Sequence, residues 1–269
     1  MKRAWNLTRE AVVYRHDAFS SGLRAAGFDV CRGEPQGAPG NLLLIWSRYG
    51  EYHARANRFE AAGGMVVVCE NGYIGPGGQS PHQMQPRQVY ALARGYHNDS
   101  TVIPKATPER WNALGVTLRP WRTAGNHILI LPNRSFGVPE RMMPSDWANH
   151  VRRRLLKLTK REVRLRPHPG NDAPRKPLAD DLRDCWSAVI WSSSAGVHAL
   201  VAGVPVICEA PYWIAKGAAY GGLRCVENDS PGVDIDRLPA MERLAHGQFS
   251  LAEIQDGTAF RAVLDFGSA

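Results

Sequence analysis

Short apolar runs recur along the chain, and more polar stretches with helical spacing lie between them. The runs at 11–14, 42–46 and 65–69 are bounded by turn residues and have the length of buried strands. Residues 48–62 have helical character, and the Gly-Gly pair that follows them is a typical helix stop. Continuous apolar runs that alternate with helices predict a parallel sheet covered on both faces.

The pattern restarts after a proline-containing stretch at 104–124, which we interpret as the link between two domains. Ser145 is the expected N-cap of the first helix beyond it, and a last helix is expected between Leu244 and Phe260. In the second part we predict strands at 127–131, 162–166, 188–191 and 204–208, and helices at 145–161, 178–184 and 195–202. The chain of 269 residues is then divided into an α/β domain at 1–124, a second at 125–245 and a C-terminal helix in 246–269.

Polar or small residues lie at the ends of three consecutive predicted strands of the second domain. Asn133 and Arg134 follow the first strand, Arg166 and His168 lie at the end of the second, and Ser192–Gly196 follow the third. The carboxyl ends of parallel strands meet at one edge, where open α/β sheets bind ligands. Arginine binds phosphate oxygens bidentately, and a helix N-terminus with small residues offers free backbone N–H groups to an anion. The sequence therefore predicts an anion-binding edge, although simple N-capping by the serines would also explain the small-residue loop.

These motifs resemble a known family. The order strand, His-Pro turn, strand, Ser-Ser-Ala-Gly loop and helix, then Ala-Leu-x-x-Gly-Val-Pro-Val, resembles the donor half of GT-B glycosyltransferases, and also capsule-type and glycerophosphate polymerising transferases. The resemblance covers residues 125–245. It implies an α/β GT-B fold, with two Rossmann-like domains whose parallel sheets face a central cleft. It further implies a donor in the second domain, an acceptor in the first, and a final helix that crosses back to the first domain.

The resemblance places a nucleotide-sugar donor, most simply a UDP-sugar such as UDP-glucose, at the predicted anion-binding edge. Many GT-B enzymes carry a glutamate on the helix after the small-residue loop, where it binds the donor ribose. This chain offers His198 instead, which either contacts the ribose or packs the helix. The expected donor residues are Asn133, Arg134, Arg166, His168, Ser192, Ser193, Ser194, Gly196 and His198.

Glu70 is the expected catalytic base of the first domain. It follows the predicted strand at 65–69 and precedes a long loop at 71–86 that is rich in glycine, proline and glutamine. Transfer with inversion needs a carboxylate that deprotonates the attacking hydroxyl. This layout resembles phage DNA glucosyltransferases of the GT-B type. The alternative bases are Asp17 and His16, and Glu70 could instead serve only as a loop cap or an ion-pair partner.

Charge is distributed unevenly between the two predicted domains. The net charge is +8, with 15 Lys and Arg against 9 Asp and Glu in residues 1–124, and 18 against 16 in the remainder. An excess of +6 in the first part suggests a polyanion as acceptor. We therefore expect the acceptor to be double-stranded DNA with a 5-hydroxymethylated pyrimidine, flipped out of the stack. The residues expected to bind it are Arg48, Tyr73, Arg87 and Arg94. A generally basic protein without a nucleic-acid partner is the simpler reading.

Two other functions stay open at this stage. The acceptor could be a cell-envelope glycan or a lipid carrier, and the chain could also be a non-catalytic nucleic-acid-binding protein on a degenerate GT-B scaffold. Affinity for nucleotide-sugars separates the last of these from the enzymes.

Cofactor and compartment are inferred from what the sequence contains. The five cysteines are scattered without a C-x-x-C pair, which fits a reducing cytoplasm, the host's if the gene is from a phage. No tightly bound cofactor is expected, and no motif requires a divalent metal, because Asp234-Ile235-Asp236 lacks a preceding strand. No apolar run approaches the ~20 residues of a membrane span. We expect a monomer that binds no membrane.

Overall fold

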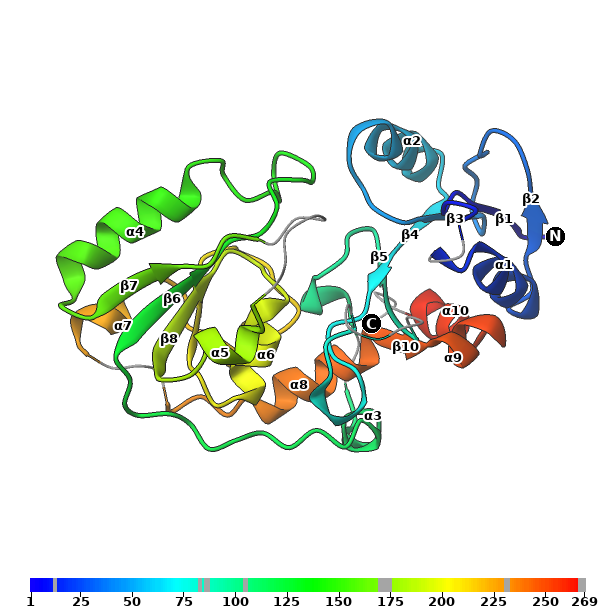
Figure 1. Ribbon diagram of the computed structural model, residues 1–269. Helices are drawn as coiled ribbons and strands as arrows, with labels where there is room; N and C mark the ends of the chain where they lie inside the picture. The colour runs from blue at the N-terminus through cyan, green and yellow to red at the C-terminus, as the bar shows by residue number, and fades with distance from the viewer. Residues whose placement is uncertain are drawn as a thin grey trace.

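Two β-sheets with flanking helices make up the protein (Figure 1). The computed structural model describes residues 1–11, 14–81, 84, 88–103, 106–168, 176–229 and 233–265. Within these residues the first sheet has six strands in the order β10-β5-β4-β3-β1-β2, and the second has four in the order β7-β6-β8-β9. The second sheet is wholly parallel.

The first half of the chain supplies five strands of the six-stranded sheet. Its elements are β1 (Arg3–Asn6), α1 (His16–Ala25), β2 (Asp29–Cys31), β3 (Leu42–Ile45), α2 (Gly50–Ala61), β4 (Met65–Asn71), β5 (Val89–Arg94) and α3 (Pro108–Ala113), with short 3-10 helices at Pro76–Gly78 and Ser100–Val102. The strands predicted at 42–46 and 65–69 and the helix at 48–62 are confirmed with small shifts of their bounds.

The strand predicted at 11–14 is wrong at both of its described ends. Ala11 and Tyr14 belong to no strand, and residues 12 and 13 lie outside the described part. The Tyr14 N–H donates to the Ala11 carbonyl at 2.9 Å, and Arg15 takes a left-handed φ of 53° before α1 begins. A tight turn therefore leads into a helix where the short apolar run had suggested a strand.

Strand β5 was not predicted, and it changes the character of the first sheet. It pairs antiparallel with β4, and β10 (Gln248–Ser250) pairs antiparallel with β5. The parallel pattern predicted for this sheet holds only for β1 to β4. Glu70 consequently lies inside β4, opposite Ala91, and not in the loop after the strand.

The second half follows the predicted order closely. Its elements are β6 (His127–Leu131), α4 (Trp147–Leu158), β7 (Glu162–Leu165), α5 (Leu178–Asp181), β8 (Cys185–Ile190), α6 (Ala195–Val201), β9 (Val206–Cys208), a 3-10 helix at Lys216–Ala218, α7 (Arg224–Glu227) and α8 (Leu238–His246). Asp146, and not Ser145, stands at the N-cap position of α4.

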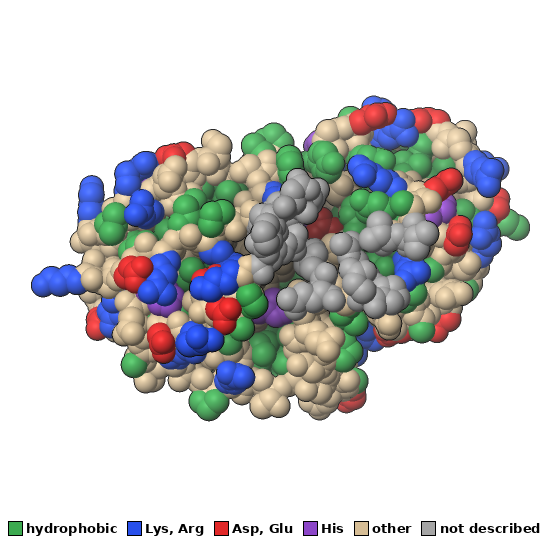
Figure 2. All heavy atoms as spheres, viewed as in Figure 1, with side chains coloured by type: hydrophobic (Ala, Val, Ile, Leu, Met, Phe, Trp, Pro, Cys, Tyr) green, Lys and Arg blue, Asp and Glu red, His purple; other side chains and the backbone are tan. Residues whose placement is uncertain are grey.

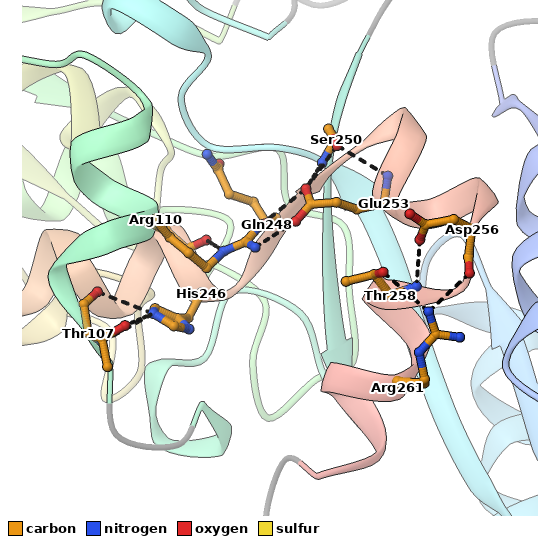
Figure 3. Close-up of polar contacts among 10 residues, drawn as sticks. Thr107, Arg110, His246, Gln248, Ser250, Glu253, Asp256, Thr258 and Arg261 are labelled. Atoms are coloured by element: carbon orange, nitrogen blue, oxygen red, sulfur yellow. Dashed lines mark hydrogen bonds and ion pairs between the residues drawn. The ribbon is translucent and has the colours of Figure 1, made fainter.

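The C-terminal segment is not the single helix that the sequence suggested. After α8 it forms β10, then α9 (Leu251–Gln255) and α10 (Thr258–Leu264). Gly247 lies between α8 and β10. A Cβ at this position would lie 2.7 Å from the side chain of Ile103, which favours glycine there. Ser250 and Glu253 form a capping box that starts α9 (Figure 3). These last elements pack beside α1 on the first sheet (Figure 1).

Arg110 of α3 anchors the start of this returning segment. Its guanidinium donates to the carbonyls of Ala245 and Gln248 at 3.0 and 2.7 Å and pairs with Glu253 at 2.6 Å (Figure 3). The buried side chain of Gln248 points the other way, to the backbone of the loop after β4. It accepts from the N–H groups of Tyr73 and Ile74 and donates to the Ile74 carbonyl at 2.7 Å.

One apolar core joins the inner faces of the two sheets. Side chains alternate along β3, so that Leu44 faces this shared core while Leu43 packs with Phe59 under α2. The shared core continues through Trp213 to Leu200 of α6. The far face of the second sheet has its own cluster under α4 and α7. None of the described helices has both the length and the apolar character needed to cross a membrane.

Candidate functional site

A pocket lies where the two halves meet. It encloses about 450 Å³ including its open mouth. The first half contributes Arg48, Tyr96 and His97, and the second contributes Asn133, Arg134, Phe136, Gly137, Val138, Arg141, Met142, Met143, Ser192 and Tyr212. None of these described lining residues is acidic, so the lining suits a neutral or anionic ligand. Tyr49 and Phe136, both exposed, stack across the two halves with ring centroids 6.2 Å apart.

Residues 96–99, which follow β5 and which we call the junction segment, contact both halves of the protein. Tyr96 lies between two guanidinium groups, with Arg48 at 4.2 Å and Arg141 at 4.3 Å from its ring centroid. His97 lines the pocket. Asn98 and Asp99 are buried and bind residues of the second half. The segment therefore links both halves at the pocket.

Glu70 reaches the pocket through His97. The His97 Nε2 and Glu70 Oε1 atoms are 3.4 Å apart, and both side chains are about one-third exposed. A carboxylate beside an imidazole is an arrangement that can accept and pass on a proton. The structure thus places the predicted base beside a histidine that sequence reasoning had not singled out.

Asp99 and Arg141 form an ion pair between the halves. Their Oδ2 and Nη2 atoms are 2.8 Å apart, and the Asp99 side chain is only 6% exposed. Burial favours the neutral carboxyl, but hydrogen bonds from Thr101 and the charge of Arg141 outweigh it and hold the pKa of Asp99 below its usual value. The ion pair is therefore charged at neutral pH.

This pair makes the stability of the protein depend on pH. Because the pKa of Asp99 is lowered on folding, its ionised form stabilises the protein above about pH 3.9, the pKa of unfolded aspartate, and that stabilisation is lost as pH falls through the folded-state pKa. The wild type should lose melting temperature more steeply on acidification below about pH 4 than Asp99→Asn, which has no carboxyl to protonate. Calorimetric melting of both proteins across this range measures the difference. Parallel acid profiles would contradict the prediction.

The structure brings three of the predicted donor residues together at the pocket. Asn133 accepts from the Ser192 N–H at 3.0 Å and donates to the Ser192 hydroxyl at 3.3 Å, so the two loops are fastened to each other. Arg134 lines the pocket beside them and donates from Nε to His168 Nδ1 at 3.3 Å. His168 is exposed and is not among the described residues that line the pocket.

The other small residues of the predicted loop lie at the start of α6, outside the described pocket lining. The Ser193 hydroxyl accepts from the Ala195 N–H at 3.3 Å, and Ser194 is exposed at the N-cap of α6. A Cβ at Gly196 would lie 2.8 Å from both Ile190 and Trp213, which requires glycine for the close approach of α6. His198 is half-buried within α6. Only Ser192 of the predicted loop lines the pocket.

Arg166 is engaged away from the pocket. Its guanidinium pairs with Asp181 of α5 and donates to the Lys176 carbonyl at 2.6 Å. Burial raises and the hydrogen bonds from Lys176 and Arg166 lower the pKa of Asp181, with a net lowering that keeps the pair charged. Arg166 is therefore held in an ion pair that joins the end of β7 to α5.

Two of the predicted acceptor residues, Arg48 and Tyr73, are buried. Arg48 is 4% exposed and binds Glu60, Asn57 and the Gly95 carbonyl. Tyr73 is buried and accepts from the Asn98 N–H, and burial, with the charge of Glu70, raises the pKa of its phenol. Arg94 is half-buried at the end of β5, and Arg87 lies outside the described residues. Arg48 nevertheless lines the pocket, whereas Tyr73 is not among the described residues that line it.

The two alternative bases lie on α1. Asp17 is exposed in the first turn of that helix. His16 is occupied by Thr8, with its Nδ1 atom 2.9 Å from the Thr8 carbonyl and 3.2 Å from the Thr8 hydroxyl. Neither residue is among those that line the pocket in the described part of the chain.

Sequence reasoning missed four residues that build the site, namely His97, Asn98, Asp99 and Arg141. A signal existed for the first three, because a run of polar residues directly follows the apolar stretch of β5. Arg141 carried no such signal, since it lies in an irregular loop after β6. Among the described residues, no group of three or more His, Cys, Asp or Glu side chains is placed to hold a metal ion.

The fold is shared with structurally characterised sugar transferases. The structure titled Thermosulfurimonas dismutans KpsC, beta Kdo 2,4 transferase, superposes with a TM-score of 0.57 and 15% identity, covering 89% of this chain and 89% of that chain. The KpsC beta Kdo 2,7 transferase of the same organism superposes with a TM-score of 0.61 and 12% identity, covering 97% and 100%. No protein-family model matches the sequence, and no curated protein matches it closely enough to count as a relative.

These likenesses confirm the predicted fold class. The chain has a GT-B-like α/β fold with two mainly parallel sheets. Neither of these two structures is titled as a phage DNA glucosyltransferase, so they give the resemblance to that group no support.

Proposed function

We propose that this protein is a glycosyltransferase that moves a sugar from a nucleotide-activated donor to a hydroxyl of a cell-envelope glycan. The observation that carries the proposal is the pocket between the halves, which is lined by cationic and polar side chains of the second half and by His97 of the first, with the Glu70 carboxylate 3.4 Å from His97 Nε2. A GT-B-like fold places donor and acceptor on opposite sides of such a cleft. The similar structures, both sugar transferases, support the same reaction class.

In this proposal the second half holds the donor. Arg134 offers a charged donor to phosphate oxygens, and the Asn133–Ser192 contact fixes the loop beside it. Preorganised positive groups stabilise the negative charge that develops on the departing nucleotide. Glu70, with His97 beside it, accepts the proton of the attacking hydroxyl.

A glycan acceptor agrees with the observations better than DNA does. Both similar structures are titled as Kdo transferases. Arg48, which was expected to contact DNA, is committed to internal contacts. On the face drawn in Figure 2, Lys and Arg side chains spread over both halves and mix with acidic ones, without a basic stripe on the first half. The excess charge of residues 1–124 therefore does not mark a DNA-binding face in this view.

The proposal is tested by donor binding followed by transfer. Melting of the full chain is measured with UDP-glucose, GDP-mannose and CMP-Kdo, because a ligand of the native state raises the melting temperature. A donor that binds is then incubated with a methyl β-glycoside of Kdo, and separately with DNA containing 5-hydroxymethylcytosine. A mass gain of one sugar on the glycoside is expected. Transfer to DNA alone, or binding of DNA with no donor bound, would overturn the proposal.

Arg134 gives a first mutational prediction. Arg134→Ala should weaken binding of the nucleotide part of the donor by roughly 1.5–3 kcal/mol, the value of a hydrogen bond to a charged group. Calorimetric titration with the donor found in the melting screen measures the loss. Arg164→Ala is the matched control, because Arg164 is an exposed arginine of β7 paired with Glu162. Unchanged affinity in Arg134→Ala would move the donor site elsewhere.

A further inference from the structure

Asn98 occupies a backbone conformation that few residues adopt. Its φ is 59°, in the left-handed region, where asparagine is among the few residues with a side chain that are tolerated. The residue is 8% exposed, so its polar atoms need partners within the protein. The structure supplies a partner for each of its amide groups.

The side chain of Asn98 crosses from the first half to the second. Its Nδ2 atom donates to the Ser192 carbonyl at 2.8 Å, and its Oδ1 atom accepts from the Ile214 N–H at 3.3 Å. The backbone N–H of Asn98 donates to the hydroxyl of Tyr73 at 3.2 Å, and Tyr73 lies on the loop after β4. One residue thus joins the loop that follows Glu70 to two loops of the opposite half.

Ser192 is held from both sides by these contacts. Its N–H donates to Asn133 of its own half, and its carbonyl accepts from Asn98 of the other half. The residue before Asn98 is His97, the partner of Glu70. The buried amide of Asn98 therefore connects the donor loop directly to the residue next to His97.

We propose that Asn98 is a positioning residue that keeps the donor loop and the Glu70–His97 pair in register across the two halves. The proposal rests on the function proposed above and adds a determinant of its geometry. Only asparagine supplies a donor and an acceptor on a short side chain at this backbone conformation. Aspartate lacks the donor to Ser192, and glycine keeps the backbone but lacks both groups.

Two variants separate positioning from simple structural support. Asn98→Gly retains the left-handed backbone and removes both interdomain bonds. Asn133 still holds the donor loop, so donor affinity should stay within about threefold, while kcat should fall about 10–100-fold because the reacting groups are misplaced. Asp184→Gly is the matched control, because Asp184 has a φ of 56° and an exposed side chain at the start of β8. It should leave both constants unchanged.

Asn98→Asp adds a pH dependence of kcat that a purely structural role of Asn98 would not produce. At neutral pH its carboxylate faces the Ser192 carbonyl without a proton to donate. On acidification the protonated carboxyl regains that donor, so the kcat of Asn98→Asp divided by that of Asn98→Gly should rise. Glu70, His97, Asp99 and Arg141 surround this position in both variants, and the ratio removes the part of the pH dependence that the two variants have in common. A ratio independent of pH would overturn the role of the Ser192 bond.

Hydrogen exchange keeps this test independent of activity. The segments 192–196 and 212–216 should both exchange faster in Asn98→Gly than in Asp184→Gly, because the first loses the donor to its Ser192 carbonyl and the second loses the acceptor of its Ile214 N–H. If the wild type transfers no sugar from any donor tested, the proposed function fails, while the exchange result still shows whether Asn98 ties the two loops. A normal kcat, or unchanged exchange in both segments, would overturn the positioning role itself.

Discussion

Turnover of the Glu70→Gln variant is expected to fall about 10²–10⁴-fold, with donor affinity retained. Glutamine keeps the shape of the side chain but cannot accept the proton of the attacking hydroxyl. Glu70 lies in β4 with its carboxylate 3.4 Å from His97, so the change removes the charge of the pair and leaves the strand intact. Steady-state transfer measures the expected fall in turnover, and calorimetric titration of the same preparation measures whether donor affinity is retained.

His97→Gln shows which member of the pair acts as the base. If Glu70 accepts the proton, loss of His97 should lower turnover less than loss of Glu70 does. A larger loss in His97→Gln would make the imidazole the base and Glu70 the group that orients it. Near-normal turnover in Glu70→Gln would return the assignment to Asp17 or His16, and Asp17→Asn and His16→Gln are the variants to examine then.

The central parallel strands could be predicted because they are buried on both faces, whereas the short, partly exposed parallel strands β1 and β2 were not predicted. Strands buried on both faces are continuous apolar runs, and the runs at 42–46, 127–131 and 204–208 contain β3, β6 and β9. The antiparallel strands β5 and β10 were not predicted, each for a different reason. Strand β5 follows a stretch rich in glutamine and proline that was read as a loop, and β10 has only three residues. Its pairing with β5 depends on contacts between residues about 160 positions apart, which local patterning does not contain.

The candidate site likewise contains residues that the sequence predicted and residues that it did not. The rule that ligands bind at the carboxyl ends of parallel strands placed Asn133, Arg134 and Ser192 at the pocket. The same rule could not show that Arg166 is held by Asp181, since that partner follows a separate loop. Nor could it identify the junction segment, whose importance arises only when two domains are docked.

Gln248→Leu should lower the free energy of unfolding by about 3–5 kcal/mol. Leucine fills a similar volume but leaves the buried N–H groups of Tyr73 and Ile74 and the Ile74 carbonyl without their partner, and each such group costs about 1–3 kcal/mol. The loop after Glu70 would also lose its attachment to the C-terminal segment, which Arg110 continues to hold (Figure 3). Urea unfolding followed by circular dichroism measures the loss.

Two further variants show that the loss comes from these hydrogen bonds. Gln255→Leu makes the same chemical change at an exposed position of α9 and should alter stability by no more than about 0.5 kcal/mol. Gln248→Glu keeps an oxygen that accepts from Tyr73 and Ile74 but sets a carboxylate against the Ile74 carbonyl. Its stability should therefore recover toward the wild type as pH falls and the carboxyl regains a proton to donate. Equal stability of Gln248→Leu and Gln255→Leu would show that β10 is held by backbone pairing alone, with no contribution from the side chain that joins it to the loop after Glu70.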